Sequence, residues 1–191
     1  DLKLDFAYFV EQRNNYVKRL NSIYEKNLKN SDVDYVEGTA AFVDKHTIEV
    51  TKGEEKTRYA ADHIVIASGG LPTAQSFEGA EHCMDSDGFF EMTELPKRML
   101  VMGGGYIGVE LAGILHALGV DVTLMCRSIL LRFLDRDIVK CLMENMNKAG
   151  LKHVINSPIS KVTKEADGTL RVFSTTGEVY ECDKVLVALG R

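Results

Sequence analysis

The sequence predicts an α/β fold of two tandem units containing parallel strands, the first of them incomplete, and three observations predict it. Residues 59–70 and residues 180–191 share one pattern, in which an aspartate precedes a run of β-branched and aliphatic residues that ends in a small residue and a glycine. Such a run is typical of a parallel strand buried on both faces. An amphipathic helical segment and three short β-rich stretches precede each copy. The second copy also contains a glycine-rich turn between a strand and a helix, so we expect a three-layer, Rossmann-like unit in which a β-meander replaces the last crossover.

Local signals place the elements of the second unit in order. Gly119 ends the helix that follows the glycine turn, and Asp135 and Gly150 are suited to cap the next helix at its two ends. The expected elements are a strand at 98–102, a helix around 107–118, a strand at 120–126, a helix at 135–149, meander strands at 159–165, 169–174 and 178–181, and a closing strand at 185–187.

The first unit repeats only the later part of this order. Its expected elements are a helix from Phe6 to Leu28, meander strands at 33–43, 47–51 and 57–60, and a closing strand over Ile64–Ile66. By the spacing of the second unit, the matching glycine turn would precede residue 1, so we expect the chain to be the central piece of a longer protein. We assign residues 1–70 to the C-terminal part of one nucleotide-binding domain and residues 71–191 to a second domain.

Composition and charge exclude several classes of function. The formal net charge of −5 and the pI near 5.6 provide no overall positive field for nucleic acid or an anionic membrane. No apolar run reaches the roughly 20 residues that span a bilayer. The four cysteines and five histidines show no metal-ligand spacing, so we expect no metal site and buried or half-buried free thiols in a reducing compartment.

The glycine turn reads Gly103-x-Gly105-x-x-Gly108. Alone this pattern is a weak signal, but a predicted strand enters it and a predicted helix leaves it, which is the context that a dinucleotide site requires. Gly103 permits the tight turn, Gly105 lets the backbone approach a pyrophosphate, and Gly108 lets the helix pack closely on the strand. The helix N-terminus then offers its free N–H groups to the phosphates.

The residue at the end of the next strand selects the cofactor. NAD sites carry an acid about 20 residues past the glycines, whereas NADP sites carry an arginine that meets the 2′-phosphate. Here Arg127 occupies that place and Arg132 follows in the same loop. For either arginine alone a solvated surface charge is the favoured interpretation, but the pair at this position favours phosphate binding. Glu110 in the first helical turn is explained either by the helix dipole or by a functional role, and Tyr106 by packing or by a lid.

Two such units in tandem resemble the flavoprotein disulfide reductases, which bind FAD with one unit and a nicotinamide cofactor with the next. The stretches Gly103–Gly113, Asp85–Phe90 and Arg13–Asn21 look most like the glutathione reductase branch, while Arg127–Arg132 looks more like the large thioredoxin reductases. The resemblance covers nearly the whole chain. It implies an NADPH-dependent enzyme with glutathione disulfide as substrate, a homodimer, and a cytoplasmic location, with a mitochondrial one left open.

The resemblance also assigns roles residue by residue. For FAD it implies contacts from Ala40, Ser68 and Gly69, and for NADPH a lid at Tyr106 and a 2′-phosphate clamp at Arg127 and Arg132. The further implied NADPH contacts are Gly103, Gly104, Gly105, Ile107, Gly108, Glu110 and Gly190.

The family's redox dithiol and catalytic histidine have no counterpart in this sequence, so we expect no catalytic residue in the chain and no turnover by the chain alone. Two alternatives stay open: a large thioredoxin reductase, and an NADPH-binding sensor module without a redox centre. Arg127 disfavours a third, an NAD enzyme of the lipoamide dehydrogenase type.

Overall fold

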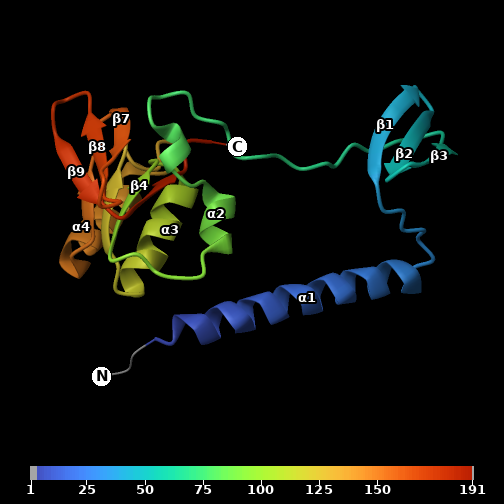
Figure 1. Ribbon diagram of the computed structural model, residues 1–191, viewed down its shortest axis with the longest axis horizontal. Helices are drawn as coiled ribbons and strands as arrows, with labels where there is room; N and C mark the ends of the chain where they lie inside the picture. Colours follow the sequence, from blue (N-terminus) through green and yellow to red (C-terminus); the bar gives the residue numbers. More distant parts are fainter. Residues whose placement is uncertain (1–3, 191) are drawn as a thin grey trace. The chain divides into compact units, whose positions relative to one another are not determined.

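The structure is a computed structural model that describes residues 4–190. The chain divides into two compact units, one over Tyr8–Gly69 and one from Gly70 onward that also takes in the residues before Tyr8. The elements are α1 (Phe6–Asn30), β1 (Thr39–Asp44), β2 (Thr47–Lys52), β3 (Glu55–Ala60), η1 (Ala80–His82), α2 (Ser86–Glu91), β4 (Arg98–Met102), α3 (Tyr106–Ala117), β5 (Asp121–Met125), α4 (Arg136–Ala149), β6 (Lys152–Val154), β7 (Ile159–Lys164), β8 (Leu170–Ser174), β9 (Val179–Cys182) and β10 (Lys184–Val187), as Figure 1 shows.

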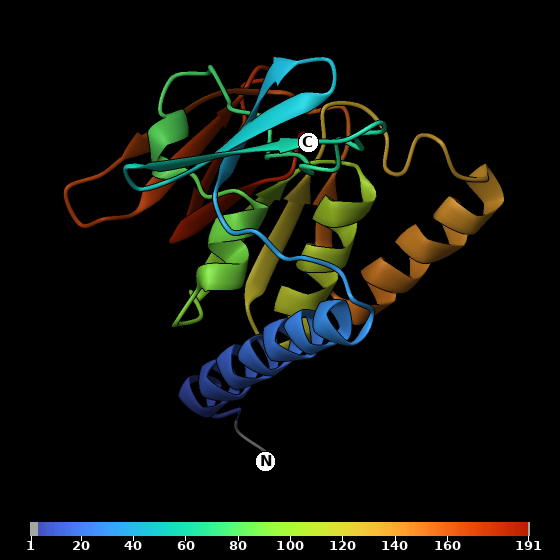
Figure 2. The same ribbon diagram turned by 90° about the vertical axis from the view of Figure 1, so that its right-hand side faces the viewer.

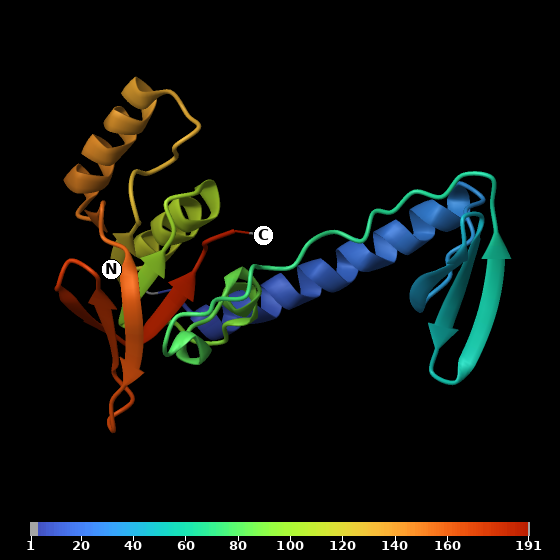
Figure 3. The ribbon, with the colours of Figure 1, turned by 90° about the horizontal axis from the view of Figure 1, so that it is seen from above.

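The C-terminal unit is built in three layers around a parallel sheet of four strands in the order β10-β4-β5-β6. Helices α3 and α4 cover one face, and the antiparallel meander β7-β8-β9 covers the other (Figure 3). The predicted α/β fold with a meander in place of the last crossover is therefore confirmed for this unit.

Burial on both faces explains the uniformly apolar strands. In β4, Met99 and Val101 pack in the cluster on the helix face, whereas Leu100 and Met102 pack in the cluster on the meander face. All four side chains are at most 2% exposed. Each face therefore removes its own apolar area from water, which is the dominant favourable contribution to folding.

Caps fix the ends of the helices where the sequence predicts them. The Asp135 carboxylate accepts hydrogen bonds from the N–H groups of Asp137 and Ile138, and Gly150 ends α4 in the left-handed conformation with φ of 82°. Helix α2 was not predicted, because six residues are too short for a periodic signal. Its start is nevertheless capped by Asp85, which accepts from Asp87 and Gly88.

The outer edge of β10 is bonded by one residue from outside the sheet. The N–H of Met84 donates to the carbonyl of Val185 at 2.9 Å, and the N–H of Val187 donates to the carbonyl of Met84 at 2.7 Å. At the opposite end of the sheet, β6 has only three residues and begins with Lys152. The sheet thus ends in a backbone bridge on one side and a short strand on the other.

The unit Tyr8–Gly69 contains most of the long helix α1 and the antiparallel sheet β1-β2-β3, drawn in cyan in Figure 2. The helix and the three strands are confirmed, although β1 begins at Thr39 rather than at residue 33. Its apolar side chains remain largely in solvent: Tyr16 is 57% exposed and Phe42 53%, and Val50 is the one buried position in the three strands. No helix among residues 4–190 has the length and apolarity to cross a bilayer.

The predicted strand over Ile64–Ile66 is wrong. These residues have no regular structure, and Val65 and Ile66 are 87% and 74% exposed. In the other unit, the equivalent strand β10 is held by parallel pairing with β4. No strand in the described part of the first unit takes the place of β4, so the apolar run lacks a pairing partner.

Candidate functional site

The glycine turn lies at the carboxyl end of β4, where open parallel sheets bind their ligands. Gly103 has φ of 141°, and a Cβ there would overlap the carbonyl oxygen of Ala188 beyond the end of β10. A Cβ on Gly108 would overlap the carbonyl oxygen of Gly103. Gly103 thus needs both the unusual backbone angle and the missing side chain, and Gly108 allows α3 to pack directly on the turn.

Gly105 differs from its two neighbours in the motif. It is the N-cap of α3, offers no capping side chain, and a Cβ added to it would meet nothing within 4 Å. The first N–H groups of α3 have no partner inside the helix. The space next to Gly105 is therefore open, and free donors at a positive helix end face it.

The loop after β5 is joined directly to the glycine turn. The N–H of Leu131 donates to the carbonyl of Gly104 at 2.6 Å. A Cβ on Gly104 would lie 2.9 Å from the carbonyl oxygen of Ile129 and 3.0 Å from the Cβ of Cys126. The sequence did not reveal this contact, which places the loop carrying Arg127 and Arg132 beside the turn.

Both arginines are exposed and available to an anion. Arg132 donates from Nη2 to the hydroxyl of Ser128 at 2.7 Å. Among residues 4–190, neither guanidinium lies within ion-pair distance of a carboxylate. Two forked donors beside free helix N–H groups can bind a ligand that carries a terminal phosphate and a pyrophosphate.

The helix residues of the site require one correction. Helix α3 begins at Tyr106, so Glu110 is its fifth residue and the first turn contains no acid. The helix dipole, which acts within the first turn, therefore does not explain Glu110. Tyr106 is 65% exposed, which disfavours the packing interpretation, and Ile107 is half-buried against the core.

Gly190 lies at the same edge of the sheet, just past β10, with φ of 142°. Its carbonyl accepts from the N–H of Thr73 at 3.0 Å, and the N–H of Ala188 donates to the carbonyl of Met102 at 2.7 Å. The ends of β4, β5 and β10 thus meet around the glycine turn.

The residues predicted for FAD lie in the other unit. Ala40 is on β1, and Ser68 and Gly69 lie in the irregular segment after β3, all three exposed. No hydrogen bond joins these three residues in the described part of that unit. At Gly38, just before β1, an added Cβ would overlap the side chain of Val50 and the carbonyl oxygen of Thr51.

The cysteines are free thiols with different surroundings. Burial, with a smaller contribution from Cys182, raises the pKa of Cys83 to about 12, and burial raises the pKa of Cys182 to about 11. Burial likewise raises the pKa of Cys126. Cys141 is exposed, contrary to the prediction that all four are at least half-buried. Because the thiolate is the nucleophile, the half-buried Cys83 and the buried Cys126 and Cys182 are poor redox groups.

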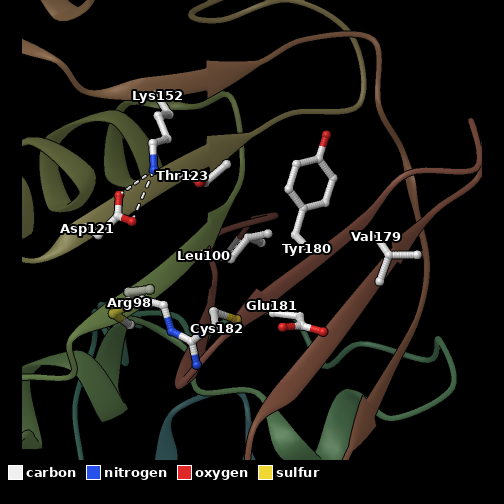
Figure 4. Close-up of a pocket in the computed structure, with 10 residues that line it drawn as sticks. Arg98, Leu100, Asp121, Thr123, Lys152, Val179, Tyr180, Glu181 and Cys182 are labelled. Carbon is white, nitrogen blue, oxygen red and sulfur yellow. Dashed lines mark hydrogen bonds and ion pairs between the residues drawn. The ribbon is translucent and has the colours of Figure 1, made fainter.

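A small cavity of about 230 Å³ lies at the amino end of the parallel sheet, opposite the glycine turn (Figure 4). Its charged groups are already paired: Lys152 donates to both oxygens of Asp121, at 2.8 and 3.0 Å, and Arg98 binds Asp183 at 2.8 Å. We therefore place the candidate site at the carboxyl end. No group of three potential metal ligands occurs within the described residues.

Comparison with known proteins identifies the family to which this fold belongs. Residues 3–191 match the family model described as pyridine nucleotide-disulphide oxidoreductase. The chain belongs to this family. It is 41% identical over 175 residues to a glutathione reductase from Yarrowia lipolytica, covering 88% of this chain and 37% of that protein. It is 36% identical over 192 residues to a glutathione reductase from Schizosaccharomyces pombe, covering 98% and 41%.

The family fold is found in solved structures as well. A Cu(II) complex of the HOCl-induced flavoprotein disulfide reductase RclA from Escherichia coli superimposes with a TM-score of 0.88 at 26% identity, covering 98% of this chain and 43% of that one. The chain thus spans about two fifths of the length of the relatives it matches.

Proposed function

We propose that this chain provides the NADPH-binding part of a flavoprotein disulfide reductase of the glutathione reductase type. The observation that carries the proposal is the hydrogen bond from Leu131 to Gly104, because it sets the two free arginines beside the glycine turn. Glutathione reductases among the relatives support the same enzyme class.

The residues present fit NADPH. Gly103, Gly104 and Gly108 leave no room for side chains, while the open space at Gly105 admits a pyrophosphate against the start of α3. Arg127 and Arg132 would bind the 2′-phosphate, and no competing carboxylate occupies them in the described structure.

The remaining assignments follow from the resemblance. Tyr106 would cover the nicotinamide ring as a lid, and Ile107, Glu110 and Gly190 would contact the nucleotide. NADPH, when bound, supplies a hydride. The residues of this chain bind and orient the NADPH molecule and exclude water from it.

Several further points belong to the whole enzyme and remain predictions. They are FAD as second cofactor with contacts at Ala40, Ser68 and Gly69, glutathione disulfide as substrate, a homodimer, and a cytoplasmic location with a mitochondrial one left open. A large thioredoxin reductase stays the alternative within the same chemistry. An NADPH-binding sensor module without a redox centre stays the alternative from another class.

Calorimetric titration of the chain with NADPH and with NADH tests the proposal. A hydrogen bond to a charged group contributes about 1.5 to 3 kcal/mol, so Arg127→Ala or Arg132→Ala should weaken NADPH binding about ten- to a hundredfold. NADH lacks the 2′-phosphate, so its binding should change far less. Lys140→Ala, which removes an exposed charge from α4, is the matched control. Equal losses for both cofactors would remove the case for NADPH.

A further inference from the structure

The loop between β5 and α4 carries both arginines but has little apolar anchoring. Leu130 is 1% exposed, whereas Phe133 is 97% exposed and Leu134 52%. Leu131 packs partly against the same core cluster, so burial fixes the loop at these two adjacent residues, and hydrogen bonds must determine the conformation of the rest.

The backbone of this loop is strained where it leads into Arg132. Leu131 has φ of 46°, in the left-handed region that residues with a side chain rarely adopt. Such a conformation persists only where its surroundings hold it. The N–H of Leu131 donates to the carbonyl of Gly104 at 2.6 Å, and the carbonyl of Leu131 accepts from the N–H of Leu134 at 2.9 Å, which leaves one lone pair of that carbonyl for a second donor.

Arg136 holds that carbonyl. Its Nη1 donates to the carbonyl of Leu131 and its Nη2 to the carbonyl of Leu130, each at 3.0 Å. The planar guanidinium bridges two successive peptide groups, which the single ammonium of a lysine cannot reproduce with the same geometry.

The position of Arg136 supports a role outside its own helix. It is the first residue of α4, where a positive charge is disfavoured by the helix dipole. Asp135 and Asp137 already provide the cap and the first-turn acid. No ion pair of Arg136 occurs within residues 4–190, so helix stability and pairing leave this arginine unexplained.

We infer that Arg136 is a positioning residue for cofactor selection: its two hydrogen bonds to Leu130 and Leu131 hold the strained turn that aims Arg132 at the 2′-phosphate. The inference rests on the proposed function, and it adds a residue that does not itself touch the cofactor. It concerns the choice of NADPH over NADH, because under the proposed function the arginine that this turn orients binds the 2′-phosphate, which NADH lacks.

The test compares three substitutions at this position in the full chain. Arg136→Ala removes both hydrogen bonds and the charge, whereas Arg136→Lys keeps the charge. Arg136→Gln removes the charge but keeps an N–H donor on a shorter side chain. Lys140→Ala removes a charge one helical turn away and is the control. Calorimetry gives the dissociation constants for NADPH and NADH, and hydrogen exchange followed by NMR reports the Leu131 amide.

Arg136→Ala and Arg136→Lys should each weaken NADPH binding about three- to tenfold, change NADH binding less than about twofold, and speed exchange at Leu131. Lys140→Ala should change none of these. Full NADPH affinity in Arg136→Lys would show that charge alone matters and would overturn the inference. If Arg136→Ala does not fold, Arg136→Lys and Arg136→Gln still decide.

The two proposals fail in different ways. Equal losses of NADPH and NADH binding in Arg132→Ala refute the NADPH site itself. A selective loss in Arg132→Ala together with normal binding in Arg136→Ala refutes only the positioning role. An unchanged hydrogen-exchange rate of the Leu131 amide in Arg136→Ala also refutes the positioning role, whichever cofactor is bound.

Discussion

Two glycines of the same turn should respond to alanine in opposite ways. At Gly103 an added Cβ overlaps the backbone of Ala188, and φ of 141° is costly for alanine. At Gly105 an added Cβ meets nothing within 4 Å, and φ is −81°. The first substitution therefore perturbs the fold, whereas the second perturbs only the space in front of α3.

The magnitudes follow from these contacts. Strain at a disfavoured backbone angle costs about 1 to 3 kcal/mol, and overpacking costs about 1 to 3 kcal/mol. Gly103→Ala should thus lower the free energy of unfolding by about 2 to 6 kcal/mol. At roughly 3 to 5 °C per kcal/mol for a unit of this size, Tm should fall by about 6 to 30 °C. Gly105→Ala should change Tm little, because the restriction that alanine imposes on the unfolded chain is offset by its poorer fit at the N-cap of α3.

Binding should show the reverse order of effects. Gly105→Ala places a methyl group where the pyrophosphate approaches, and we expect NADPH affinity to fall at least about tenfold, or 1.4 kcal/mol. Thermal unfolding followed by circular dichroism and calorimetric titration measure the two effects. The reasoning would be refuted if Gly105→Ala lowered Tm as much as Gly103→Ala, or if it bound NADPH with unchanged affinity.

Two further predictions concern titration and thiol reactivity. Burial opposes ionisation of Asp183, but hydrogen bonds from Arg98 and from the backbone N–H groups of Lys97 and Arg98 outweigh it and lower the pKa of Asp183 below 3.8. Its contribution is therefore present above pH 4 and lost as the pH falls below that, so Asp183→Asn should destabilise the fold by about 1 to 2 kcal/mol at pH 7 and flatten the acid limb of the stability curve measured in urea. In native protein at pH 7.5, iodoacetamide should modify Cys141 first, and Cys83 and Cys182 only upon unfolding, because burial raises the pKa of both buried thiols; mass spectrometry that finds Cys83 modified as fast as Cys141 would contradict the burial argument.

Local signals made the second unit predictable. Asp135 and Gly150 act on their own neighbours, so the ends of α4 can be read without knowing the fold. The strand at Ile64–Ile66 failed because an apolar run indicates burial but does not supply the partner strand that buries it. The glycines and arginines could be placed by spacing, yet their junction at Leu131 and Gly104 could not, since it depends on how a loop folds back over a turn. Arg136 gave no signal at all, because its partners are main-chain carbonyls that no side-chain pattern encodes.

The bridge made by Met84 determines how the parallel sheet can meet other polypeptides. An unpaired strand edge is a template on which a foreign strand can add and aggregation can start. Met84 bonds the outward-facing N–H of Val187 and carbonyl of Val185 with its own backbone, so β10 offers no template to a foreign strand. A foreign strand could add only at the opposite edge of the parallel sheet, along β6. This edge strand has three residues and begins with a lysine, so it is short and charged and disfavours strand addition.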